Sequence, residues 1–182
     1  MDFKKIIALF TVPVLAITMF ASLTEASNTV TASGTITIQG FPAVHDNVVV
    51  KTGNGSYSNH ISIGNKTFGP NNTSEVFRIY IKNQGSNPTG ELHYGIKATG
   101  IDSDEETTIA QNINIKIEEY GPPIVYTHYN DSLAGLQNGI GDGFIYVYPN
   151  INESLMYIQI TLTANQLYNS QTLTYNLEFF QK

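Results

Sequence analysis

Residues that could do chemistry are few and scattered in this 182-residue chain. It has no cysteine, which excludes a disulfide framework, a thiolate zinc site, an iron–sulfur cluster and a thiol nucleophile. The four histidines fit no metal-ligand spacing: His45, His60, His93 and His128. The sequence contains no GxSxG nucleophile elbow, and the glycine-rich segment 139–143 lacks the lysine of a phosphate loop. We therefore predict that the chain is not an enzyme.

The densest group of acidic residues is the segment DSDEE at 102–106. Oxygen ligands at alternating positions of a loop suit Ca²⁺, so Asp102, Asp104 and Glu105 are the candidate metal ligands, and no other cofactor is expected. The segment lacks the glycine and the terminal glutamate spacing of an EF-hand, and the alternative is a solvated acidic turn between strands. The two glutamates at 118–119 are adjacent, so on a strand they would point to opposite faces and could not act together as a glycosidase pair.

The charge of the chain is low and acidic. Lysine and arginine number 9, aspartate and glutamate 15, and the net charge is −6. A nucleic-acid binder needs clustered cations, and so does a protein held at a membrane surface by basic residues. Neither class of partner is therefore expected. Hydrophobic residues make up 41 %, which is enough for a packed core.

The N-terminal segment has the order of a secretory signal peptide. Two lysines within residues 1–5 precede an uncharged apolar run at 6–23, and the small-residue site TEAS follows at 24–27. We predict a signal peptide over residues 1–26 and no membrane attachment after its removal. A permanent membrane anchor is the alternative, because the apolar run is of borderline length. Cleavage is favoured because Pro13 interrupts the run.

Alternation of apolar and polar residues runs through the rest of the chain and predicts half-buried strands. The strongest candidates lie at 29–38, 77–82, 112–117, 156–162 and 173–179, and further candidates lie at 43–51, 60–64, 91–98, 124–129 and 143–148. Turns rich in glycine, asparagine and proline separate them. Roughly ten strands at this spacing predict an all-β chain with an antiparallel β-sandwich, jelly-roll-like or Ig-like. We expect one such domain over residues 41–182.

Asn-X-Ser/Thr acceptor sites occur six times. They are Asn54, Asn65, Asn71, Asn72, Asn130 and Asn152. All six fall in predicted turns, where a glycan would be solvated. Chance is the alternative explanation, because Asn, Ser and Thr are abundant. Their use would require a host with N-glycosylation, most consistent with an archaeal glycoprotein.

The first strand after the signal peptide has no charged residue. Its alternate side chains are Val30, Ala32, Gly34, Ile36 and Ile38, and the next charged residue is Asp46. An uncharged strand at a chain terminus is prone to pair with other molecules. It either pairs within its own sheet or completes the sheet of a neighbouring subunit by strand addition. We therefore set residues 27–40 apart as a candidate donor strand.

Residues 69–86, GPNNTSEVFRIYIKNQGS, resemble a strand motif of the TasA/camelysin family of biofilm fibres. The layout of the chain is also similar to that of archaeal surface filaments, namely the bundling pili and threads. This resemblance implies a jelly-roll-like sandwich that polymerises by donor-strand complementation. It implies that residues 30–38 are the donor strand.

The sequence hypothesis is thus a secreted, glycosylated pilin. Copies would join head to tail into an extracellular cell-surface filament that serves adhesion and biofilm formation, with other filaments or cells as further partners. The alternative is a monomeric secreted β-sandwich binding module, associated with carbohydrate or with an S-layer. In that module the N-terminal strand would pair within its own sheet.

Overall fold

A computed structural model describes residues 28–38, 47–85, 92–121, 123–140, 145–147, 156–166 and 170–181. The predicted signal peptide, Asp46, His45 and the acceptor Asn152 lie outside these residues. The described elements, in chain order, are β1 (Val30–Ile38), β2 (Val48–Thr52), β3 (His60–Phe68), β4 (Ser74–Asn83), β5 (Leu92–Thr99), α3 (Asp104–Gln111), β6 (Ile113–Gly121), β7 (Ile124–Ser132), a 3₁₀ turn (Gly135–Asn138), β8 (Ile145–Val147), β9 (Tyr157–Ala164) and β10 (Gln171–Gln181). No helix among these residues is long and apolar enough to cross a membrane.

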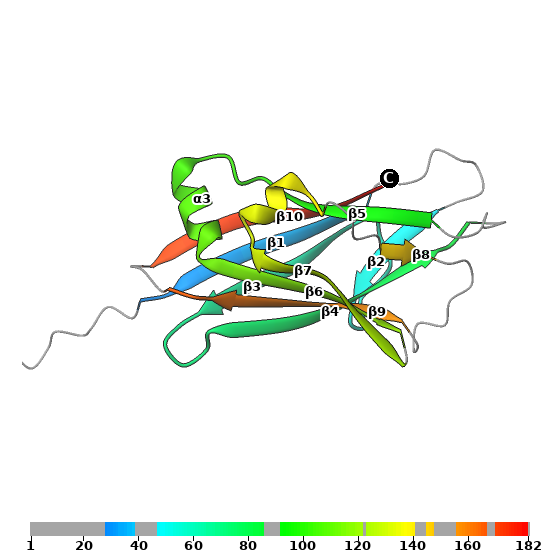
Figure 1. Cartoon of the computed structure of the whole chain (residues 1–182), viewed down its shortest axis with the longest axis horizontal. Coiled ribbons are helices and arrows are strands. Elements are labelled where there is room, and N and C mark those ends of the chain that lie inside the picture. The colour runs from blue at the N-terminus through cyan, green and yellow to red at the C-terminus, as the bar shows by residue number, and fades with distance from the viewer. Residues whose placement is uncertain are drawn as a thin grey trace, which may run out of the picture.

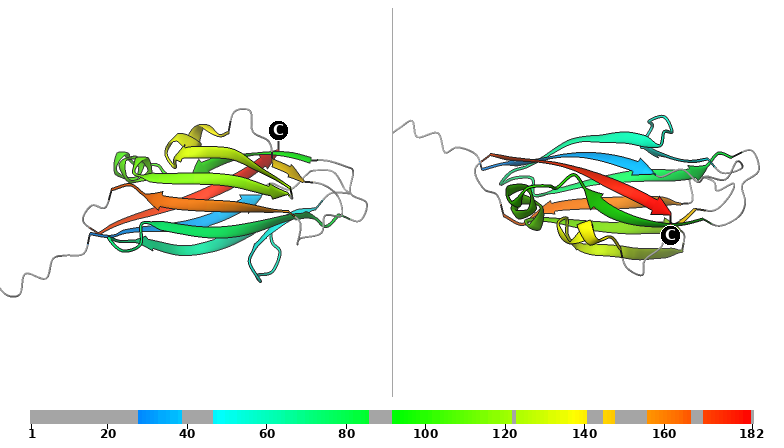
Figure 2. Two further views of the ribbon diagram at one scale, coloured as in Figure 1. Left: turned by 60° about the horizontal axis from the view of Figure 1, so that its bottom comes forward. Right: turned by 90° about the horizontal axis from the view of Figure 1, so that it is seen from above.

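The strands form two five-stranded sheets that pack face to face (Figures 1 and 2). Sheet A has the order β3-β1-β10-β5-β8, and sheet B has the order β2-β4-β9-β6-β7. The predicted all-β sandwich is therefore confirmed. Figure 2 shows the two layers from the side, with α3 at one end of the sandwich.

Period-two alternation builds the core, as the sequence predicts. In β1 and β9, buried and partly exposed residues alternate without a break. One side of each strand therefore faces the other sheet, and its side chains are shielded from water. The largest fully buried side chains come from both sheets and include Tyr94, Tyr175, Phe68, Phe179 and Ile117.

One strand pair departs from the predicted antiparallel pattern. β1 runs antiparallel to β3 but parallel to β10. Because β3 and β10 run in opposite directions, any strand between them must be parallel to one of the two. A short hairpin would force two strands to run antiparallel. None links β1 to β10, so these two strands can run parallel.

The helix α3 was not predicted, because the acidic segment resembles a turn. Ser103 accepts a hydrogen bond from the backbone N–H of Glu106, and the Glu106 carboxylate accepts from the backbone N–H of Ser103. This reciprocal pair is a capping box, and the Ser-x-x-Glu spacing is its sequence signal. The acidic first turn also suits the positive end of the helix dipole.

Candidate functional site: the first strand and its groove

The first strand lies in the middle of sheet A. All nine residues of β1 face a partner in β10, from Val30 opposite Gln171 to Ile38 opposite Phe179. On its other side β1 pairs with β3 along most of its length. In the strand order, β1 alone joins β3 to the other strands of sheet A. Without β1, the described part of sheet A would have a gap lined by two unpaired strand edges.

The inner side of β1 contributes to the core. The predicted donor-strand residues Val30, Ala32, Ile36 and Ile38 are at most 2 % exposed, and Gly34 is buried as well. Each apolar residue removed from water contributes roughly 25 cal/mol per Å² to the stability of the assembled sandwich. The alternation read from the sequence therefore identifies the side chains that fill the groove.

Gly34 occupies a position where a larger residue would collide with the groove. A Cβ atom there would overlap Ile63 Cδ1 and lie 2.6 Å from the Tyr175 hydroxyl. Ile63 reaches this position because β3 has a register irregularity opposite Gly34, next to Gly64, whose φ is +72°. A β-bulge of this kind re-aims a side chain.

This close approach can fix the register of β1. A slip by two residues would keep the same face of the strand inward but would place Ala32 or Ile36 where Gly34 now lies. Either side chain would overlap the space held by Ile63 and Tyr175. The groove is therefore shaped for one register.

Tyr175 of β10 stands at the centre of the groove. Its hydroxyl is buried and has no hydrogen-bond partner among the described residues. Burial raises the pKa of Tyr175 well above its ordinary value, because the ionised phenolate would lose its hydration. The side chain therefore acts as a bulky neutral wall that faces Gly34.

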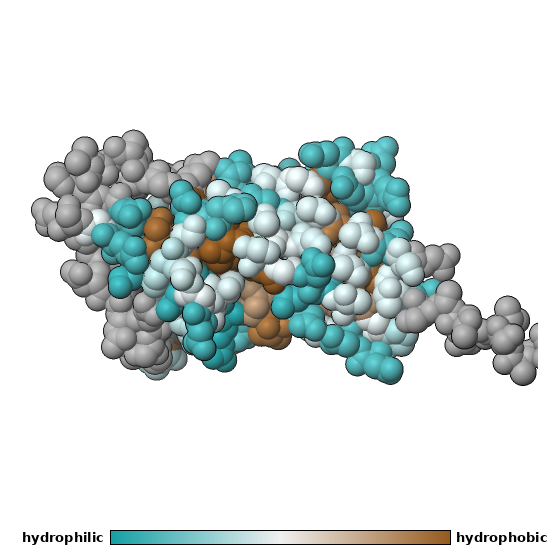
Figure 3. All heavy atoms as spheres, turned by 180° about the vertical axis from the view of Figure 1, so that it is seen from behind, coloured by the Kyte–Doolittle hydropathy of each residue, from teal (hydrophilic) through white to brown (hydrophobic). Residues whose placement is uncertain are grey.

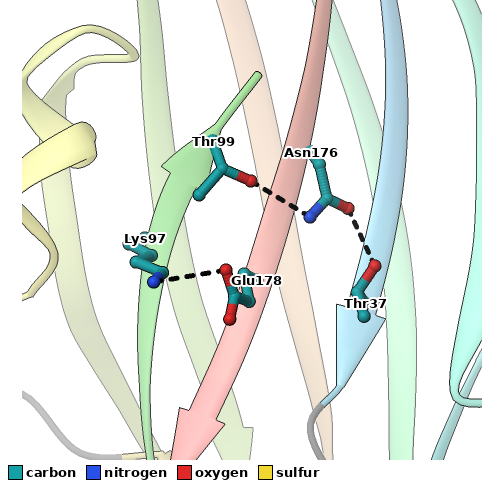
Figure 4. Close-up of polar contacts among 5 residues, drawn as sticks. All are labelled: Thr37, Lys97, Thr99, Asn176 and Glu178. Carbon is teal, nitrogen blue, oxygen red and sulfur yellow. Dashed lines mark hydrogen bonds and ion pairs between the residues drawn. The ribbon is translucent and has the colours of Figure 1, made fainter. Parts of the chain in front are cut away.

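The outer side of β1 is recognised by polar side chains. Asn176 Oδ1 of β10 accepts hydrogen bonds from the hydroxyls of Thr35, at 3.0 Å, and Thr37, at 3.1 Å. The same amide donates from Nδ2 to Thr99 Oγ1 of β5 at 3.2 Å, so one side chain connects three strands (Figure 4). Beside it, Lys97 Nζ lies 3.3 Å from Glu178 Oε2.

Polar contacts also join β1 to β3. Ser33 donates to Asn65 Oδ1 at 2.7 Å, and the hydroxyls of Thr31 and Thr67 lie 3.2 Å apart. Figure 3 shows the side of the sandwich formed by sheet A, which is mostly pale or teal with small hydrophobic patches. β1 is thus held by apolar contacts on one face and by neutral hydrogen bonds on the other.

The acceptor asparagines among the described residues are all exposed. Asn54, Asn71 and Asn72 lie in turns, as predicted. The placement of the other two in turns was wrong: Asn65 lies in β3 and Asn130 in β7. Both strands are at the edge of a sheet, and this is why strand residues are still exposed there. Whether any of these residues carries a glycan stays a prediction.

The candidate calcium ligands lie at the start of α3. Asp102, Asp104 and Glu105 are exposed. The nearby Glu106 is engaged by backbone N–H groups of Asp102 and Ser103 and by the Ser103 hydroxyl, and these hydrogen bonds lower its pKa. No group of three or more His, Cys, Asp or Glu side chains with metal-binding geometry occurs within the described ranges. Calcium binding therefore stays a prediction.

One histidine–carboxylate contact could not be read from the sequence. His128 Nε2 lies 2.7 Å from Glu119 Oε2, and each side chain is 8 % exposed. A register irregularity between β6 and β7 places this histidine beside Glu119. Of the other histidines, His60 contacts Thr37 in β1, and His93 is exposed on β5.

A scan against models of known protein families gives no match for this sequence, and a search of curated proteins gives none either.

Proposed function

We propose that the chain is a structural subunit of an extracellular filament, in which β1 of one copy fills the groove between β3 and β10 of the next. The observation that carries the proposal is the central position of β1. Its pairing within one chain is also what the monomeric binding module predicts, and the test below distinguishes the two. The first described strand in chain order is inserted at the centre of a sheet and pairs on both sides. A head-to-tail contact of this kind extends into a fibre when the rotation between successive copies does not close a ring.

The chain between β1 and β2 is long enough for exchange. Nine residues, 39–47, separate the two strands. Fully extended, a segment of this length spans about 30 Å, which is comparable to the length of the strand itself. β1 is the first of the described strands in chain order, so its donation leaves the pairing among the other described strands unchanged.

A self-completed monomer and a strand-exchanged fibre contain the same contacts around β1. They differ in which chain supplies the strand. The fibre gains kinetic persistence without disulfides, because a subunit can leave only when a complete central strand is withdrawn. Secretion, glycosylation at exposed asparagines and a role in adhesion and biofilm formation belong to the same proposal. The partner in assembly is a second copy of the chain.

The absence of native cysteine allows a direct test. Thr35 and Asn176 are opposite each other in β1 and β10, and neighbouring strands at this spacing fit disulfide geometry. A Thr35→Cys chain is mixed with an Asn176→Cys chain under oxidising conditions. Strand exchange predicts a covalent dimer that joins the two different chains, visible on a non-reducing gel, and filaments by electron microscopy.

The matched control uses two strands that exchange does not separate. Lys97 and Glu178 are paired between β5 and β10, so a mixture of Lys97→Cys and Glu178→Cys chains should give no specific mixed dimer. A double Thr35→Cys/Asn176→Cys chain that closes only within itself, together with the absence of a mixed dimer, would overturn the proposal. Filaments that persist after deletion of residues 28–39 would do the same.

A further inference from the structure

The outer face of sheet B carries a row of residues that crosses all five strands. Strand register aligns Lys51 of β2 with Tyr80 of β4, and Tyr157 of β9 with Tyr120 of β6, which in turn faces Val125 of β7. The rings of Tyr80 and Tyr157 have centroids 6.2 Å apart, which links the two halves of the row. At about 4.8 Å between strands, the row is about 19 Å long.

Basic side chains are interleaved with these rings. The Arg78 guanidinium lies 4.6 Å from the centroid of Tyr157, and Lys51 Nζ lies 5.5 Å from that of Tyr80. Tyr57 lies beside the row, with Lys51 and Lys82 over its ring at 4.8 and 5.8 Å. Such contacts hold the cations against the surface in fixed positions.

The charge of this face is opposite to that of the whole chain. Its outward strand positions carry the four basic residues Lys51, Arg78, Lys82 and Lys116. Among the same positions the one acidic side chain is Glu118, which lies 2.6 Å from Lys116 and is 11 % exposed. Because the whole chain has a net charge of −6, these basic residues form a segregated cationic patch, which together with the aligned tyrosines is here called the tyrosine–cation row.

We propose that the tyrosine–cation row binds an acidic polysaccharide, a chain of sugars that carry carboxylates. Carboxylates pair with guanidinium and ammonium groups, and tyrosine hydroxyls can exchange hydrogen bonds with the hydroxyls of a sugar. The row crosses the face of sheet B from one edge strand to the other and therefore fits an extended polymer. This binding does not depend on strand exchange.

The ring geometry favours a sugar chain over a nucleic acid. Tyr120 and Tyr157 stack on each other at 4.7 Å with an angle of 9°, and Arg78 covers Tyr157. A nucleic-acid base needs a free ring face on which to stack. Here the edges and hydroxyls remain for the ligand, and one hydroxyl, that of Tyr120, already accepts a hydrogen bond from Gln159.

Calorimetric titration of the full chain with a size-defined oligogalacturonate tests the proposal. We expect binding that weakens as salt is added, and much weaker binding of the methyl-esterified form, which has lost its charge. The double variant Arg78→Gln/Lys82→Gln should bind at least about tenfold more weakly. Circular dichroism of each variant confirms that it is folded.

The matched control removes two cations that also lie over aromatic rings, but away from the row. Lys66 lies over Phe77 and Lys97 over Phe180. The Lys66→Gln/Lys97→Gln variant should bind within about twofold of the unaltered chain. Equal losses in both double variants, equal binding of the esterified polymer, or tighter binding of single-stranded DNA than of the uronate would overturn the proposal. Self-association through the row without uronate binding would overturn it too.

Discussion

The strands β1 and β7 have the same length and opposite environments. Each has nine residues. β1 is central in sheet A, and every second side chain is buried. β7 is at the edge of sheet B, pairs on one side only, and leaves Ile124, Val125 and Tyr126 about half exposed. The difference shows that strand length and β-propensity do not determine where a strand lies in a sheet.

Charge and regularity separate the two strands. β1 is uncharged, and its buried and partly exposed residues alternate without a break. Other parts of the protein can therefore pair with both of its edges and cover both of its faces. β7 carries His128 and Asp131 and has a register irregularity against β6. Charges and bulges are devices that protect an edge strand from unwanted pairing. β1 lacks them, and this fits its central place between two other strands.

The largest contrast is expected from one substitution made in both strands. Ile36→Ala in β1 removes a side chain that is fully buried, and should lower the free energy of unfolding by about 3 kcal/mol. Ile124→Ala in β7 removes a side chain that is 48 % exposed, and should change it by less than about 0.5 kcal/mol. Urea unfolding followed by circular dichroism measures both. Equal losses of unfolding free energy would show that the buried position of β1 gives it no greater share in stability than β7 has.

A smaller loss is expected at Gly34. An alanine there would meet Ile63 and Tyr175, and the resulting repacking should cost about 1–3 kcal/mol. Gly69→Ala is the control, because a Cβ at Gly69 has its nearest neighbour at 3.8 Å, in ordinary contact. The same unfolding measurement applies. If Gly34→Ala costs no more than Gly69→Ala, the groove does not set the register of β1.

The polar side of β1 should contribute less again. Thr35→Val removes the hydrogen bond to Asn176 and should cost about 1 kcal/mol. Thr127→Val, at an exposed position of β7, should cost less than about 0.5 kcal/mol. The midpoint of urea unfolding would report the difference. A larger loss of stability at Thr127 than at Thr35 would show that the hydrogen bonds to Asn176 do not hold β1 in place.

Much of the fold could be predicted from alternation alone. The inward residues of β1 and the strands β4, β6, β9 and β10 follow from period-two patterns, because each has one face in the core. The parallel pairing of β1 could not be predicted, because it depends on the directions of two distant strands. The helix α3 was missed although its capping spacing is visible in the sequence.

The candidate site was predictable only in part. The sequence identifies the residues that β1 would insert, but not the partners of Gly34, because Ile63 and Tyr175 come from strands far away in the chain. The tyrosine–cation row was also missed. Its members are spread over five strands, and only strand register brings Tyr80, Tyr157 and Tyr120 together.

The smallest expected effect in the core around β1 comes from the Tyr175 hydroxyl, and the Tyr129 hydroxyl of β7 is the comparison. Tyr175→Phe removes a buried hydroxyl with no partner among the described residues, and should leave stability at pH 7 unchanged or slightly higher. Tyr129→Phe in β7 removes a donor that bonds the Ser132 carbonyl at 2.9 Å, and should cost about 1 kcal/mol. Urea unfolding at pH 7 distinguishes the two.

The same pair differs in alkali. Burial raises the pKa of Tyr175, so the native state keeps this hydroxyl protonated while the unfolded chain ionises above about pH 10. The unfolded state then binds fewer protons, and native stability falls as pH rises past that value. The Tyr175→Phe variant should therefore lose less stability between pH 9 and pH 11 than the unaltered chain. Urea unfolding at pH 9 and at pH 11 measures this difference. The pKa of Tyr129 is also raised, mainly by desolvation and then by the charge of Asp131. Because this side chain is only partly buried, we expect Tyr129→Phe to diminish the loss of stability at high pH by less than Tyr175→Phe does. An equal or larger reduction from Tyr129→Phe would show that the wall facing Gly34 is open to water, and that β1 is no more tightly enclosed than β7.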